Sequence, residues 1–291
     1  MPCELCSLPT LDGLLLDGAF TGPAKPPANG SSRAWVVIHG TGSNFTAPGV
    51  LATLSAMLLQ RGEAVLRLNT RGHDLMARIP SIQGTVSGGA AWERLEHASL
   101  DIAAACSWLA ERDYQKVSLL GHSLGGVKAL LSQVSRLVID VDEIVALSPP
   151  RLNHAKLSVS DEFRSDFDRA VALVGMGQSG TLIEMREPQR AWMSASAIVD
   201  KYGPEDRYDY VPQLATMHRP MLIVLDAKSP ETSPAFEGLP EALEEVARGI
   251  ASLEVRRQSG SDIHYSGSES AIMQAILDWR ARRNRDTDIS I

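Results

Sequence analysis

The sequence predicts an α/β fold with a mostly parallel sheet of the eight-stranded type and helices on both faces. Short apolar runs recur along the chain, and such runs are typical of parallel strands that are covered on both sides. Helical patterns alternate with these runs, which implies right-handed crossovers between neighbouring parallel strands. With 291 residues and a 44% apolar fraction, the chain can bury a substantial core.

The strands begin with a predicted hairpin. Apolar and polar residues alternate from 8 to 20 around Asp12 and Gly13, a pattern typical of two short antiparallel strands joined by a turn. The buried parallel strands are predicted at residues 35–38, 64–68, 117–120, 144–147, 221–225 and 253–256.

The helices are predicted between these strands, at residues 48–60, 90–112, 124–137, 240–250 and 268–283. The first of them ends before Gly62, a suitable stop signal for a helix.

One long interval departs from the alternation. Residues 151–216 contain no convincing strand, but helical stretches occur near 161–174 and 188–201. This interval is far longer than a simple crossover. We therefore predict that residues 1–150 and 217–291 form the core, and that the interval is a helical cap or lid. It would cover the carboxyl ends of the strands, where open α/β sheets bind ligands.

Charge and hydropathy exclude several classes of function. The net charge of -7 argues against a broad basic surface for nucleic acid. No apolar run approaches the roughly 20 residues of a membrane span. Residues 1–10 lack a basic segment and contain Pro2 and Pro9, unlike a signal peptide. We expect a cytoplasmic protein that acts on a small molecule, and the oligomeric state stays open.

Cys3 and Cys6 form a C-x-x-C pair, which invites a zinc or redox interpretation. A structural zinc site needs about four ligands, and no second pair completes one. A thioredoxin-like pair would lie between a strand and a helix rather than at the amino terminus. We therefore expect neither a zinc site nor a redox centre at this pair. Cys106 lies in an apolar helical stretch, and three cysteines without a disulfide framework suit a reducing compartment.

The strongest chemical signal is the segment GHSLGG at residues 121–126, which matches G-x-S-x-G. It follows a predicted strand and precedes a predicted helix, as this motif requires. A serine on such a sharp turn needs small neighbours, and the helix that follows presents backbone N–H groups to developing negative charge. The alternative is a glycine-rich turn with an incidental serine. The flanking strand and helix favour Ser123 as a nucleophile.

A second motif, HGTG at residues 39–42, follows the strand at 35–38. With these two motifs the chain resembles the α/β-hydrolase superfamily of serine hydrolases, from about residue 8 to 283. The resemblance implies an oxyanion hole made by the backbone N–H groups of Thr41 and Leu124. It does not assign His39 as the base, and we expect this histidine to hydrogen-bond its own loop.

The same resemblance places the general base after the last strand. Of the seven histidines, only His264 lies between the final predicted strand and the final predicted helix. Its segment, SGSDIHY at 259–265, is similar to the histidine loop of the family. A neutral imidazole within reach of Ser123 would accept its proton. The alternative is an exposed loop histidine without a role in catalysis.

The carboxylate that would orient His264 departs from the family pattern. It is expected in the turn DAKSPE at 226–231, where an ungapped comparison puts Ser229 at the usual place of the aspartate. Asp226 at the strand end is the preferred candidate. Glu231, a carboxylate from elsewhere, or no acid at all are the alternatives. Asp262 is too close in sequence to His264 to be the default partner.

A looser likeness concerns a subgroup that includes siderophore-ester hydrolases. It rests on the amino-terminal strands, the segment HGTGSNF at 39–45 and the turn RGHD at 71–74. This turn resembles an arginine–glycine turn of the superfamily, and we expect it to shape the pocket wall. Asp74 stands where a glycine is expected.

The resemblance therefore implies an acyl-enzyme on Ser123 and hydrolysis of a carboxylic ester, thioester or lactone. This mechanism needs no metal and no organic cofactor, and we expect none. Hydrolysis of carbon–carbon bonds next to ketones is an alternative on the same scaffold. A non-catalytic ligand-binding protein is another, and the irregular acid turn is its main support. In the predicted cap, acidic residues roughly balance Arg and Lys, so we expect no strongly charged substrate.

Overall fold

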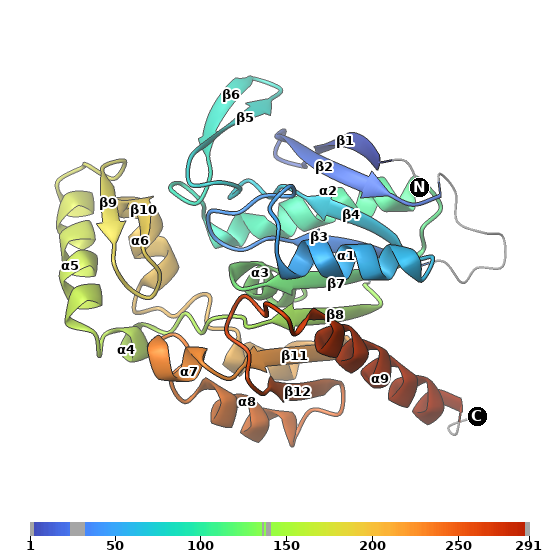
Figure 1. Ribbon diagram of the computed structural model, residues 1–291. Coiled ribbons are helices and arrows are strands. Elements are labelled where there is room, and N and C mark those ends of the chain that lie inside the picture. Colours follow the sequence, from blue (N-terminus) through green and yellow to red (C-terminus); the bar gives the residue numbers. More distant parts are fainter. Residues whose placement is uncertain (1–2, 24–32, 136, 138–140, 289–291) are drawn as a thin grey trace.

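A sheet of eight strands organises the chain in the computed structural model, which describes residues 3–23, 33–135, 137 and 141–288 (Figure 1). The strands are ordered β1-β2-β4-β3-β7-β8-β11-β12. The pairs β1–β2 and β2–β4 are antiparallel, and every pair from β4 to β12 is parallel. The predicted fold class is confirmed. The strand bounds are β1 (Cys3–Pro9), β2 (Leu15–Thr21), β3 (Arg33–Ile38), β4 (Ala64–Leu68), β7 (Lys116–His122), β8 (Glu143–Leu147), β11 (Met221–Asp226) and β12 (Leu253–Gln258).

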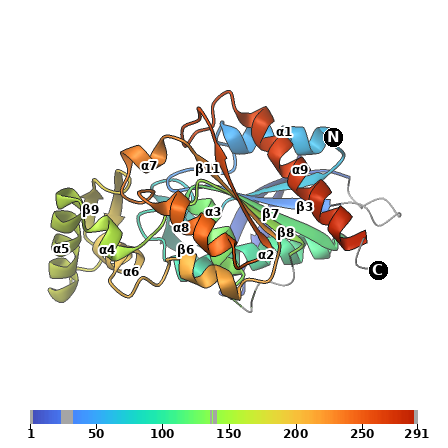
Figure 2. The same cartoon turned by 90° about the horizontal axis from the view of Figure 1, so that it is seen from below.

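Helices cover both faces of this sheet (Figure 2). One face carries α1 (Val50–Gln60) and α9 (Glu269–Asp288). The other carries α2 (Ala98–Ala110), α3 (Leu124–Ser132) and α8 (Leu239–Ala247). Successive side chains of a strand point to opposite faces, so each buried strand contributes side chains to two cores.

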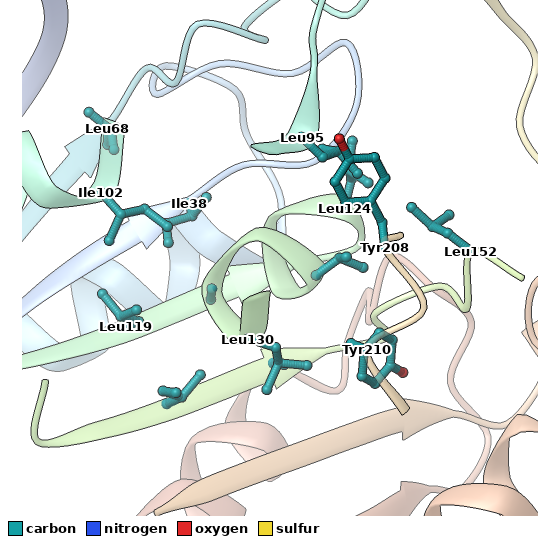
Figure 3. Close-up of a cluster of buried hydrophobic side chains, with 14 of the residues drawn as sticks. Ile38, Leu68, Leu95, Ile102, Leu119, Leu124, Leu130, Leu152, Tyr208 and Tyr210 are labelled. Carbon is teal, nitrogen blue, oxygen red and sulfur yellow. The ribbon is translucent and has the colours of Figure 1, made fainter. Parts of the chain in front are cut away.

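Alternate side chains of a single strand belong to different cores. In β3, Trp35 and Val37 pack with the apolar residues of α1 and α9. Their neighbours Val36 and Ile38 pack with α2 and α3. Figure 3 shows Ile38 in this second core, with Ile102 from α2 and Leu119 from β7 beside it. Because both faces are covered, the central strands are apolar throughout, which explains the runs seen in the sequence.

Several predicted boundaries shift. The helix predicted at 90–112 is a short 3₁₀ turn, η1 (Leu95–His97), followed by α2. The helix predicted at 124–137 ends at Ser132, and part of its predicted carboxyl end lies outside the described residues. The hairpin of β5 (Ala77–Ser81) and β6 (Gly84–Gly88) was not predicted. Its strands are mostly exposed, so they carry no apolar alternation.

Residues 151–216 are not purely helical, and that part of the prediction is wrong. This interval also contains an antiparallel pair of strands that forms a separate small sheet next to α5 and α6 (Figure 1). Within the predicted helix at 188–201, residues 191–194 form the strand β10. Its buried Ala191 and Met193 alternate with the exposed Trp192, a period of two rather than 3.6. The elements are α4 (His154–Leu157), α5 (Asp161–Gly175), β9 (Leu182–Met185), β10 (Ala191–Ser194), α6 (Ala195–Tyr202) and η2 (Val211–Thr216).

None of the described helices combines the length and the apolar character that crossing a membrane requires.

The central strand β7 provides a test of the core. Leu119 is fully buried, whereas Leu5 on β1 is 76% exposed. We expect Leu119→Ala to lower the free energy of unfolding by about 2–5 kcal/mol, because it removes apolar contacts and leaves a cavity. Leu5→Ala is the matched control and should change it by less than about 0.5 kcal/mol. Urea denaturation measures both, and equal effects would contradict the assigned core.

Candidate active site

Ser123 lies on a sharp turn between β7 and α3. Its backbone angles are φ 53° and ψ -127°, and a positive φ is uncommon for residues other than glycine. The flanking glycines are required by close backbone approach. A Cβ on Gly125 would lie 2.1 Å from the Ile38 carbonyl oxygen, and one on Gly121 would lie 2.2 Å from the Gly125 oxygen. No side chain fits at either position, so β3, β7 and α3 hold Ser123 in this conformation.

The loop after β3 packs directly on this turn. A Cβ on Gly40 would lie 3.1 Å from the Ser123 Cβ and 3.2 Å from the His122 carbonyl oxygen. Within the described part of the chain, the backbone N–H groups of Thr41 and Leu124 donate to no other residue. Both residues border the same cavity as Ser123. Two unpaired donors therefore belong to the wall that surrounds the serine.

This cavity has a volume of about 780 Å³. The turns after β3, β7 and β11 and the loop after β12 contribute to its wall. Residues 151–216 contribute Leu152, Pro188, Gln189 and Tyr202. The cavity thus lies between the carboxyl ends of the strands and this interval.

His264 borders the cavity together with Ser123. Its side chain is exposed, and its ring forms no hydrogen bond with any residue that the structure describes. The backbone around it is held instead. The His264 N–H donates to Asp262 Oδ1 at 3.0 Å, and His122 Nε2–H donates to the Ile263 carbonyl oxygen at 2.7 Å. The residue that precedes Ser123 therefore positions the residue that precedes His264.

Burial lowers the pKa of His122. The ring is thus held neutral, with its single N–H directed at the Ile263 carbonyl.

On the other side of His264, Tyr265 connects its loop to Asp226. The Tyr265 hydroxyl lies 2.6 Å from Ser148 Oγ and 3.0 Å from the Val224 carbonyl oxygen. Ser148 Oγ in turn donates to Asp226 Oδ2 at 2.8 Å. Asp226 is therefore linked to the histidine loop through two hydroxyl groups.

The Asp226 carboxylate is 2% exposed and does not border the cavity. Its Oδ1 accepts the backbone N–H groups of Lys228 at 3.1 Å and Ser229 at 2.7 Å. Among the described residues it makes no hydrogen bond to His264. Ser229, at the usual family position of the acid, borders the cavity, and Glu231 is exposed on the short helix α7 (Ser229–Thr232).

His39 is buried behind the loop that follows β3. Its Nδ1–H donates to the Gly40 carbonyl oxygen at 2.8 Å, and its Nε2 accepts the Thr70 backbone N–H at 3.2 Å. Burial and the nearby Lys128 ammonium lower the pKa of His39 to about 3. His39 is therefore a neutral structural residue that holds its own loop.

A group of buried charges supports this loop, and the sequence did not reveal it. Lys128 of α3 donates to Thr70 Oγ1 at 3.0 Å and pairs with Glu93 Oε1 at 2.5 Å. Lys201 of α6 lies 3.7 Å from Glu93 Oε2. Burial disfavours the Glu93 carboxylate, but the two lysines outweigh it and hold the pKa of Glu93 below its usual value. The one available signal was a lysine within the apolar segment VKALL.

The turn at residues 69–74 supports the loop after β3 from behind. The Asp74 N–H donates to the Ser43 carbonyl oxygen at 2.8 Å, and Asn44 Nδ2 donates to Asp74 Oδ1 at 2.7 Å. Asp74 has a φ of 57°, which explains why a glycine is expected there. None of the described residues of this turn borders the cavity directly, but the turn holds Ser43 and Asn44, which do border it.

In the described ranges, no group of three or more His, Cys, Asp or Glu side chains is arranged to hold a metal ion. The three cysteines are free thiols. Cys3 is exposed on β1, whereas Cys6 and Cys106 are buried.

Comparison with known proteins identifies relatives at two levels. A family model described as "Alpha/beta hydrolase family" matches residues 35–271. No curated protein matches the chain in sequence.

Three solved structures illustrate the likeness of fold. Esterase Pf2001 of Pyrococcus furiosus is 16% identical with a TM-score of 0.62, over 97% of this chain and 91% of that one. The alpha/beta hydrolase GrgF of Penicillium sp. is 15% identical with a TM-score of 0.62, over 97% and 99%. Est1E of Butyrivibrio proteoclasticus, with ferulic acid bound, is 18% identical with a TM-score of 0.61, over 95% and 99%.

The buried His39 predicts an acid-sensitive contribution to stability. Its folded-state pKa lies well below the ordinary 6.5, so the unfolded chain takes up its proton first as the pH falls. The contribution of His39 to the free energy of unfolding is complete above about pH 6.5. It is lost progressively toward pH 3, at up to ~1.4 kcal/mol per pH unit. Urea unfolding from pH 7 to pH 4 should show a shallower pH dependence for His39→Asn.

The exposed His218 offers the matched control. In His218→Asn, the free energy of unfolding should depend on pH as it does in wild type. A His39→Asn slope equal to that of wild type would contradict the assigned neutral, buried state.

Proposed function

Because the chain belongs to the alpha/beta hydrolase family, we propose that it is a serine hydrolase that cleaves an ester-like bond. The substrate class is a carboxylic ester, thioester or lactone. One observation carries the proposal: Ser123, at a positive φ on a strand-to-helix turn, borders the same cavity as His264 and two unpaired backbone N–H groups.

Ser123 Oγ attacks the carbonyl carbon of the substrate while His264 accepts the hydroxyl proton. The bond to the leaving group then breaks, and His264 returns that proton to the departing oxygen or sulfur. A water molecule next attacks the acyl-enzyme and gives its proton to His264. The bond to Ser123 Oγ breaks, the proton returns to the serine, and the free acid leaves.

The oxyanion is stabilised by the backbone N–H groups of Thr41 and Leu124. Support comes from their lack of other partners and from the packing of Gly40 against Ser123. Donors that are already oriented need no rearrangement when charge develops, and one such donor contributes about 10²–10³ in rate. The buried His39 and Lys128 contacts keep this loop in place from behind.

Asp226 is the proposed acid of the triad. Support comes from its burial and its position at the end of β11. Asp226 contacts Ser148, which in turn contacts Tyr265. These contacts fix the backbone of the loop that contains His264. The free ring of His264 can turn toward Ser123 when substrate fills the cavity, since catalytic hydrogen bonds are often completed only in the complex.

Residues 1–150 and 217–291 form the proposed core, and residues 151–216 the proposed cap. Support comes from the cavity wall, to which this interval adds Leu152 and Tyr202. Lys201 and Glu93 pair across the two parts. A small-molecule substrate enters between them.

Two other functions use the same cavity. A carbon–carbon bond hydrolase would use the same serine, histidine and oxyanion hole. A non-catalytic binding protein is favoured by one observation, the His264 ring without a carboxylate partner in the described chain.

Labelling and hydrolysis separate these functions. We expect a fluorophosphonate probe to label Ser123, because only an activated serine reacts with it. We also expect p-nitrophenyl esters from acetate to palmitate to be hydrolysed. Ser123→Ala and His264→Ala should each lower kcat by at least about 10³, since both belong to one catalytic unit. Wild-type protein that neither reacts with the probe nor releases nitrophenol would favour the binding protein.

The acid is tested by a matched pair of substitutions in one turn. Asp226→Asn should lower kcat by about 10² or more with little change in KM, because the histidine loses the charge that stabilises its protonated form. Glu231→Gln, at the exposed site five residues later, should keep kcat within about twofold of wild type. The reverse pattern would assign the acid to Glu231.

A further inference from the structure

The wall of the cavity carries one sign of charge. Among the described residues that line it, Arg67 is the only permanently charged side chain, and none is an aspartate, a glutamate or a lysine. The acidic residues of 151–216 that balance the basic ones in the sequence do not border the cavity. The one fixed charge of the described lining is therefore positive, although the protein as a whole has a net charge of -7.

Arg67 lies on β4 and is partly buried. Its Nη2–H donates to the Ala47 carbonyl oxygen at 2.8 Å. No carboxylate of the described residues pairs with it. By contrast, Arg71 pairs with Asp12 and Asp101.

Burial lowers the pKa of Arg67, and the nearby Cys3 on β1 opposes this effect only in part. No carboxylate contributes to the balance, so the guanidinium is partly desolvated without a carboxylate partner. Such a desolvated cation is costly unless an anion pairs with it.

The remaining N–H groups of Arg67 are available. A guanidinium has five donors, and one is used by Ala47. None of the Arg67 nitrogens is among the fully buried atoms of the described chain that lack a partner, so its other donors are not sealed off from solvent. The fork of two parallel N–H bonds fits a carboxylate. The adjacent amino-terminal end of α1, at Gly49, has a partial charge of the same sign.

We propose that Arg67 binds a carboxylate that the substrate carries in addition to its ester-like bond. The substrates are then monoesters or thioesters of acids with a second, free carboxyl group, or esters with a carboxylate in the alcohol part. This inference rests on the proposed serine hydrolase and names its substrate class. It replaces the expectation, drawn from charge balance in the sequence, of a substrate without strong charge.

The test uses two esters that differ in one charge. The mono-p-nitrophenyl ester of adipic acid has a free carboxylate, and p-nitrophenyl methyl adipate masks it. We expect wild type to have the higher kcat/KM for the charged ester. In Arg67→Gln, the ratio of the two kcat/KM values should fall about 10- to 100-fold, the range for a hydrogen bond to a charged group. Arg67→Lys should retain part of the preference, because it keeps the charge but loses the fork.

Arg61 supplies a matched control. It also donates to a backbone carbonyl, that of Met57, but it is exposed and lies outside the cavity. Arg61→Gln should keep the wild-type ratio. A ratio that changes equally in both variants would reflect overall charge and would overturn the assignment to Arg67.

Inhibition adds a readout that is independent of turnover on the charged ester. Adipate should inhibit hydrolysis of p-nitrophenyl butyrate more strongly than hexanoate does, and Arg67→Gln should remove this difference. If Ser123 is labelled and both adipate esters react equally in wild type and Arg67→Gln, the carboxylate site is wrong and the hydrolase stands. If neither ester reacts and Ser123 is not labelled, the proposed hydrolase itself fails.

Discussion

The close approach of three backbone segments at Ser123 is the constraint on which the site depends. The helix α3 comes so near to β3 that Gly125 lies against the carbonyl oxygens of Ile38 and His39. This contact forces the turn between β7 and α3 to be sharp and gives Ser123 its positive φ. It also brings the loop after β3 against the serine, so one packing contact places the serine and both unpaired N–H groups together.

A buried polar network keeps this arrangement rigid. Glu93 lies beneath Gly72, where a Cβ would be 1.9 Å from its carboxylate. Lys128 pairs with Glu93 and also donates to Thr70, which contacts His39. Charges are costly to bury unless they are paired and hydrogen-bonded. The network therefore constrains both the loop after β3 and, through Lys201, the position of α6.

Local patterns in the sequence predicted what depends on local geometry. The central strands were found from their apolar runs, because both faces of the sheet are covered. The hairpin of β5 and β6 was missed because its exposed strands have no apolar face. The strand β10 was mistaken for a helix because four residues are too few to separate a period of two from one of 3.6.

By itself the sequence determined the fold class and the sharp strand-to-helix turn at Ser123, because glycine spacing and apolar periodicity are local consequences of backbone geometry. Only the tertiary structure decided which distant side chains meet. It placed Ser148 and Tyr265 between Asp226 and the histidine loop, and it left Arg67 without a counter-charge in the cavity. Counting charges along a segment cannot reveal this, because the sign of a cavity depends on which residues the fold turns toward it.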